Sequence, residues 1–177
     1  MKRNYKNLNG FTIAEMLVTT FIIGVLSTIL VVNWRENEKN YLVQQVAQEI
    51  AQNIRKAQGM ALSGKNYQAQ TIYSFGVFFD KNNEISYKIF ADKNNNNTYQ
   101  PSDLLIEDVI LDPYIVINSL SSGNQDLNIV FSVPDGFTTF NPSATSATII
   151  IKRKGTTCPS KTCRDIIIKN TGQVTIQ

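Results

Sequence analysis

An uninterrupted apolar run near the N-terminus constrains the fold more than any other feature of this chain. It extends from Phe11 to Val32 in a sequence of 177 residues, and its single charged residue is Glu15. At about 1.5 Å per helical residue the run covers about 33 Å, which matches a hydrocarbon core of about 30 Å. A carboxylate in hydrocarbon costs on the order of 3 kcal/mol, so such an acid is usually functional. We therefore expect a membrane-spanning helix over residues 11–32 that carries a functional glutamate.

Three basic residues precede this run and predict its orientation. Lys2, Arg3 and Lys6 lie just before it, and cytoplasmic flanks are enriched in such residues. A cleaved secretory signal would need a shorter apolar core followed by a small-residue cleavage site. We therefore expect a single-pass protein of the cytoplasmic membrane, with its N-terminus in the cytoplasm and its body in an extracytoplasmic filament or at the cell surface.

The helix is expected to continue beyond the apolar run. Neither a proline nor a pair of glycines interrupts the chain before Ser63. Apolar residues then recur at spacings of three and four, as on one face of an amphipathic helix. They are Val43, Val46, Ala47, Ile50, Ile54, Ala57 and Ala61. We expect one long helix whose second half, residues 33–64, packs on a sheet and ends at Gly64 as its C-cap.

Residues 65–177 are expected to form a β-rich domain, because the apolar period changes from helical spacing to two. Strands are predicted at 71–79, 84–90, 104–111, 114–120, 127–133, 147–154, 164–170 and 173–177. The predicted fold class is α+β: one long N-terminal helix, with a membrane-spanning first half, packed on an antiparallel β-sheet body. The domains would be a leader (1–10), a transmembrane helix (11–32), an amphipathic helix (33–64) and the β-rich domain.

The start of the apolar run resembles a known processing signal. "GFTIAEMLV" at 10–18, followed by the apolar tail, is similar to the type III signal of type IV prepilins and type II secretion pseudopilins. The resemblance implies that a prepilin peptidase cuts after Gly10 and methylates the new amino group of Phe11. It also implies that Glu15 pairs with the terminal ammonium of a neighbouring subunit during assembly. Such a pair is register-specific in low dielectric, because either partner alone is costly.

The C-terminal segments narrow this resemblance to one group. "NIVFSVPDG", "ATIIIKRK" and "RDIIIKNTGQVTI" are similar to the end of the GspH/FimT group of minor pseudopilins and minor pilins. This group implies the pilin fold and a structural role in a type IV pilus-like or type II secretion filament. The implied partners are prepilin peptidase, other pilin or pseudopilin subunits, the inner-membrane assembly platform, and membrane lipid before assembly. One departure is the missing proline near the end of the apolar run, where many major pilins have a helix kink.

The segment "DKNNNNTYQPSD" has the register of a calcium loop. Oxygen-bearing side chains stand at Asp92, Asn94, Asn96, Thr98, Gln100 and Asp103. Asn97 occupies the place where glycine usually makes a sharp turn, and asparagine tolerates that conformation. Only two of the ligands are charged, so the expected affinity is in the millimolar range of about 10⁻³ M. The alternative is an asparagine-rich loop between two strands.

Two cysteines, Cys158 and Cys163, flank "PSKT" between two predicted strands. Outside the cytoplasm such a pair forms a disulfide, and zinc would need further Cys or His ligands that the sequence lacks. Basic residues surround this turn: Lys152, Arg153, Lys154, Lys161 and Arg164. Residues 150–177 hold six bases and one acid, whereas 80–135 hold nine acids and three lysines. The basic group is a candidate contact for DNA or another anion, and solvated sheet edges are the alternative.

The sequence contains no feature that indicates an enzyme. It has no histidine, no phosphate-binding loop and no nucleophile elbow. Glu107 and Asp108 are adjacent on a predicted strand, so they face opposite sides. Two further functions remain open beside the filament subunit: a pilus-associated DNA-binding subunit for DNA uptake, and a singly anchored extracytoplasmic domain.

Overall fold

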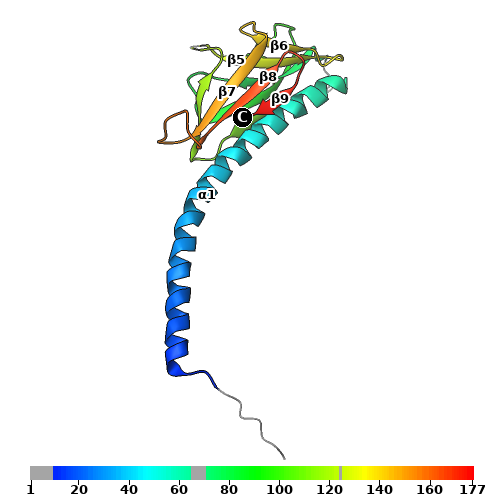
Figure 1. The fold of residues 1–177 in the computed structure, drawn as a ribbon. Helices are drawn as coiled ribbons and strands as arrows, with labels where there is room; N and C mark the ends of the chain where they lie inside the picture. The colour runs from blue at the N-terminus through cyan, green and yellow to red at the C-terminus, as the bar shows by residue number, and fades with distance from the viewer. Residues whose placement is uncertain (1–9, 65–70, 124) are drawn as a thin grey trace, which may run out of the picture. The chain divides into compact units, whose positions relative to one another are not determined.

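The computed structural model describes residues 10–64, 71–123 and 125–177, and the side chains of 30–39 are outside the described part. The chain divides into two compact units, Met1–Glu38 and Lys39–Gln177. The helix α1 (Ile13–Leu62) contributes residues to both units (Figure 1). Most of the predicted leader, including Lys2, Arg3 and Lys6, lies outside the described residues.

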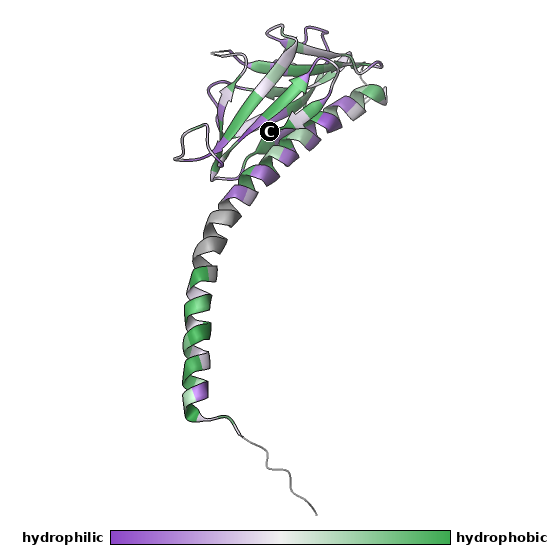
Figure 2. Ribbon diagram, in the orientation of Figure 1, coloured by the Kyte–Doolittle hydropathy of each residue, from purple (hydrophilic) through white to green (hydrophobic). Residues whose placement is uncertain are grey.

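In the first unit, α1 is described with side chains over residues 13–29, which are mostly apolar (Figure 2). Its hydroxyl side chains bond back to the helix, so their polar groups are satisfied without an external partner. Thr20 donates to the Met16 carbonyl at 2.9 Å, and Ser27 donates to the Ile23 carbonyl at 2.7 Å.

The predicted membrane-spanning segment is wrong for the part of the helix that can be assessed. Within the described residues, no helical stretch is both long and apolar enough to span a membrane. The single-pass localisation in the cytoplasmic membrane, which rested on this segment, is corrected with it.

In the second unit, residues 40–62 of α1 form the predicted amphipathic face. Val43, Ile50 and Ile54 are fully buried, whereas Gln52 and Lys56 are exposed. The helix ends as expected: Ser63 N–H donates to the Gly59 carbonyl, and Gly64 adopts a φ of 60°. A left-handed residue just after the last turn is the usual way to end a helix, and glycine adopts it without steric cost.

The body contains two antiparallel sheets. The five-stranded sheet has the order β3-β2-β1-β5-β6, and the four-stranded sheet has the order β4-β7-β8-β9. Their strands are β1 (Ser74–Phe79), β2 (Ser86–Asp92), β3 (Leu104–Ile110), β4 (Ile115–Leu120), β5 (Leu127–Ser132), β6 (Thr138–Asn141), β7 (Ser146–Arg153), β8 (Cys163–Lys169) and β9 (Val174–Ile176).

One hydrophobic core joins the second half of α1 to both sheets. Ile50 and Ile54 from the helix, Phe75 from β1, and Ile149 and Ile166 from the four-stranded sheet belong to the same buried cluster. The alternation of buried and exposed residues along β7 reflects the period of two in its sequence. The two sheets and the helix segment 40–62 therefore form one folding unit.

The predicted fold class needs correction. Within residues 10–64, 71–123 and 125–177, nine strands accompany the helix α1, and the molecule is mostly β. The strands form two sheets rather than the single sheet expected behind the helix. The expected pilin architecture, a membrane-spanning helix on one antiparallel sheet, is therefore wrong. The strand β6 was also missed, because it is short and lies between Gly136 and Pro142.

Candidate functional site

Gly10 and Phe11, the predicted cleavage site, precede the first residue of α1. Both are exposed, and the Phe11 side chain retains 81% of its accessible surface. A side chain added at Gly10 would meet no heavy atom within 4 Å. No described part of the protein therefore covers Gly10 or Phe11.

Glu15 is bound by Thr12 at the start of α1. One Glu15 carboxylate oxygen accepts from the Thr12 backbone N–H at 2.8 Å and from the Thr12 hydroxyl at 2.9 Å. The Glu15 N–H in turn donates to the Thr12 hydroxyl at 3.3 Å. This reciprocal arrangement is a capping box, which satisfies donors that the first helical turn leaves free.

The capping box changes the interpretation of Glu15. The backbone hydrogen bond from Thr12 lowers the pKa of Glu15, and the hydroxyl hydrogen bond lowers that pKa further. The expected partner of Glu15 was a charged group of a neighbouring subunit, whereas its partner within the chain is the neutral Thr12. The signal was present in "TIAE", because a threonine three residues before a glutamate is typical of a helix start.

An apolar surface surrounds this helix start and continues along the first unit. Its larger side chains retain between 45% and 83% of their accessible surface. Here the "apolar helix surface" means Ile13, Met16, Leu17, Val18, Phe21, Ile22, Ile23, Val25, Leu26 and Ile29. Exposed apolar patches of this kind are typical of interaction sites.

The predicted calcium loop is a stack of tight turns around Asp92. Its buried carboxylate accepts backbone N–H groups from Asn94, Asn95 and Asn97 at 2.8–2.9 Å. Asn97 has a φ of 57°, the left-handed conformation expected for it, and Asn95 has a φ of 60°. The second acid, Asp103, accepts the Gln100 N–H at 2.8 Å.

Tyr99 holds this loop against the five-stranded sheet. Its N–H donates to Asn128 at 2.8 Å, and its ring lies 5.0 Å from the Phe78 ring and 5.4 Å from the Phe90 ring. Among the described residues, no three His, Cys, Asp or Glu side chains gather in a way that would hold a metal ion. The expected ligands Asn94, Asn96 and Thr98 lie on the same loop, and calcium binding there stays a prediction.

The predicted disulfide between Cys158 and Cys163 is present, with 6.0 Å between their Cα atoms. Strand pairing places Lys152 opposite Cys163, so the predicted basic residues gather around the β7–β8 connection. Their cluster is here called the basic tip: Lys152, Arg153, Lys154, Lys161 and Arg164.

The cations of the basic tip differ in how firmly they are held. Arg164 donates to the Gln44 side chain at 2.6 Å and to the Cys163 carbonyl at 2.7 Å, so its position is fixed. Lys154 and Lys161 are exposed. The ion pairs found within 10–64, 71–123 and 125–177 are Lys56–Glu107 and Lys88–Asp108, and neither involves the tip.

Comparison with known proteins adds no assignment. No protein-family model matches the chain, and no curated protein or solved structure is significantly similar to it.

Proposed function

We propose that this chain is a minor pilin or pseudopilin, a structural subunit of a type IV pilus-like or type II secretion filament. The observation that supports this most is the position of the apolar helix surface directly after the Gly10–Phe11 pair and Glu15. A filament of packed helices would bury this surface against equivalent helices of other subunits. Burial of apolar area contributes about 25 cal/mol per Å².

In this proposal, prepilin peptidase cuts after Gly10 and methylates the amino group of Phe11. Both residues are exposed and precede the helix, so an extended backbone can enter a protease cleft there. Cleavage creates an ammonium group at Phe11. The Glu15 carboxylate, whose pKa the Thr12 hydrogen bonds lower, can then accept hydrogen bonds from the ammonium of a neighbouring subunit. Thr12 fixes that carboxylate at the helix start until the neighbour arrives.

A cross-linking experiment tests the helix contact. The sequence has two cysteines, and they are bonded to each other, so an added cysteine would be the sole free thiol. Full-length chain carrying Ile23→Cys, co-produced with a prepilin peptidase, is oxidised and separated without reductant. We expect disulfide-linked dimers, and we expect Glu15→Ala to reduce their yield.

The matched control places the thiol at Gln52, which is exposed on the second half of α1. Equal cross-linking of Ile23→Cys and Gln52→Cys would contradict a specific helix contact. An unchanged yield with Glu15→Ala would contradict the assembly role of that acid.

A second candidate function, DNA binding, is favoured by the basic tip alone. Its two exposed lysines, Lys154 and Lys161, form no ion pair within the described ranges, and phosphate contacts are commonly made by such groups. Fluorescence polarisation of a labelled duplex with the full chain tests this, and binding should weaken steeply as salt is raised. Absence of binding at low salt would exclude it.

A further inference from the structure

A cavity lies between the β1–β2 turn and β4 in the second unit. Its volume is about 330 Å³. Asp80 and Glu84 line one side, and residues 117–120 of β4 line the other. One cation, Lys81, also lines the cavity. The Lys81 backbone N–H donates to the Asp126 carboxylate at 3.0 Å, so a third carboxylate lies beside the turn. The rim of the cavity therefore has a net negative charge.

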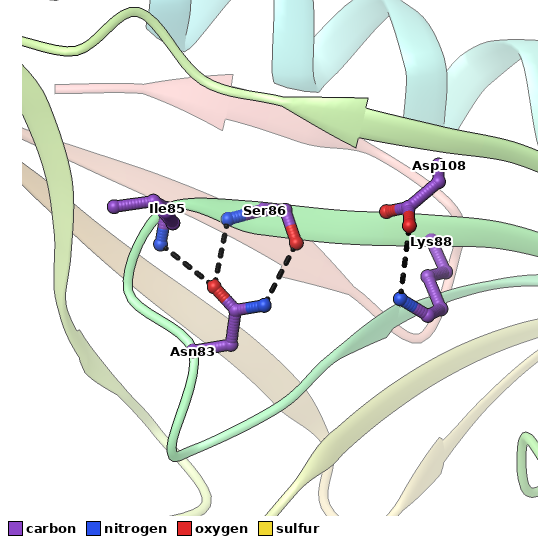
Figure 3. A network of polar contacts seen from close by, with 5 residues as sticks. All are labelled: Asn83, Ile85, Ser86, Lys88 and Asp108. Carbon is purple, nitrogen blue, oxygen red and sulfur yellow. Dashed lines mark hydrogen bonds and ion pairs between the residues drawn. The ribbon is translucent and has the colours of Figure 1, made fainter.

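The turn that carries these acids is held rigidly by Asn83 (Figure 3). The Asn83 amide oxygen accepts the N–H groups of Ile85 and Ser86 at 3.1 Å, and its amide nitrogen donates to the Ser86 hydroxyl at 2.9 Å. The Glu84 carbonyl accepts the Ile117 N–H at 2.8 Å, which ties the turn to β4. A partner would thus meet a preformed surface, which lowers the entropic cost of binding.

The basic tip and the cavity lie along the same pair of strands, at different positions. The register places the cavity residue Ile117 opposite Ile151 and the preceding residue, Val116, opposite Lys152, so the tip begins beside the cavity and extends away from it. Among the described residues, neither Glu84 nor any tip cation forms an ion pair. The body therefore carries two surfaces of opposite charge, and among the described residues no ion pair joins them.

We propose that the basic tip of one copy docks at the acidic cavity of a second copy. Lys154 and Lys161 would enter the rim formed by Asp80 and Glu84. The contact is head-to-tail when each copy uses its tip on one neighbour and its cavity on another, and such a contact propagates along an array. This inference deepens the proposed filament function and rests on it, because the array would position the bodies of successive subunits.

A charge-exchange experiment on the full-length chain tests the contact. Glu84→Cys and Lys154→Cys chains carrying different tags are mixed and oxidised, and the hetero-linked dimer is measured. The control replaces Lys154→Cys with Lys169→Cys, because Lys169 is an exposed lysine at the opposite end of β8. We expect a yield about tenfold above the control. Raising salt from about 0.1 M to about 1 M should remove this excess, because the Debye length falls from about 10 Å to about 3 Å.

Charge reversal gives the second arm. Glu84→Lys alone and Lys154→Glu alone should each self-associate less than the unmodified chain in sedimentation velocity, and an equimolar mixture should recover. Failure to recover, or a yield equal to the control, overturns the proposal. The docking proposal is also overturned if Lys154→Glu loses duplex binding and no Glu84–Lys154 cross-link forms, because the basic tip would then bind DNA rather than a second copy.

The helix cross-link separates this inference from the proposed function. Ile23→Cys dimers without a Glu84–Lys154 link would leave the filament proposal standing and overturn the docking of the tip. Absence of both links would overturn both.

Discussion

Gly172 lies in the β8–β9 turn with a φ of 79°, and it is buried. A Cβ at this position would collide with the Gln58 side chain of α1 and approach the Thr138 hydroxyl oxygen to 3.3 Å. Gly155 has a similar φ of 81°, but a Cβ there would meet nothing within 4 Å. An alanine at Gly155 would therefore introduce backbone strain alone, whereas an alanine at Gly172 would introduce both backbone strain and a steric collision.

We expect Gly172→Ala to lower the free energy of unfolding by about 1–3 kcal/mol, because the end of the Gln58 side chain must move aside in addition to the left-handed strain. Gly155→Ala should cost about 1 kcal/mol, since it carries the strain alone. Urea denaturation of both variants measures the difference. Equal losses would show that the contact among α1, β6 and the β8–β9 turn is looser than described.

Tyr87 provides a pH-dependent test of the core at the residue scale. Burial raises the pKa of Tyr87 to about 12, and the hydrogen bond from Asn53, 2.7 Å long, opposes that rise. The pKa is higher in the folded than in the unfolded chain, where it is about 10. The resulting stabilisation is therefore complete below pH 10 and is lost as pH rises toward 12.

We expect the unmodified protein to lose about 2–3 kcal/mol of unfolding free energy between about pH 10 and pH 12 through this group. In Tyr87→Phe this pH-dependent loss should disappear. The free energy of unfolding at neutral pH should fall by about 1 kcal/mol, because the hydrogen bond from Asn53 is lost. Denaturation curves at several pH values compare the two proteins. Parallel pH profiles would show that Tyr87 is not buried as described.

At the scale of elements, the start of α1 depends on Thr12. Thr12→Ala removes the hydroxyl that bonds Glu15, while Thr12→Ser keeps it. The alanine variant should raise the pKa of Glu15 toward its ordinary value and reduce helicity in the first turn. Carboxyl-carbon NMR titration measures the pKa. The serine variant is the control, and an unchanged pKa in Thr12→Ala would contradict the capping box.

The β7–β8 connection is a second element with its own test. The disulfide limits the loop that bears the crowded cations of the basic tip, so Cys158→Ser with Cys163→Ser should loosen it. We expect faster amide exchange at Thr156 and Lys161, with unchanged exchange at Ile50 of the core helix. Faster exchange throughout the body would indicate that the disulfide supports the whole fold.

Sequence reasoning was most reliable where one periodic pattern defined one element. The spacing from Val43 to Ala61 indicated the buried face of α1, and the disulfide followed from the position of Cys158 and Cys163. The division of the strands into two sheets could not be predicted from the sequence. Alternation of apolar and polar residues indicates which face of a strand is buried, but it does not indicate which strands pair with it.

The errors near the N-terminus have separate causes. Apolar length alone suggested a membrane span over 11–32, whereas no helix among the described residues is both long and apolar enough to cross a membrane. Thr12 was not predicted as the partner of Glu15, because an ion pair was expected for this acid and Thr12 is neutral. The capping pattern, a threonine three residues before a glutamate, lies inside the apolar run and was read only as part of that run.

For the whole molecule, the central claim is that the chain is processed at Gly10–Phe11 and assembled as a filament subunit. The most direct measurement is intact-mass and N-terminal peptide mass spectrometry of the full-length chain after co-production with a prepilin peptidase. The proposal predicts a mature chain that begins with N-methylated Phe11, and it predicts that Gly10→Leu leaves the chain uncut. A mature chain that retains residues 1–10, or begins at another residue, would contradict it.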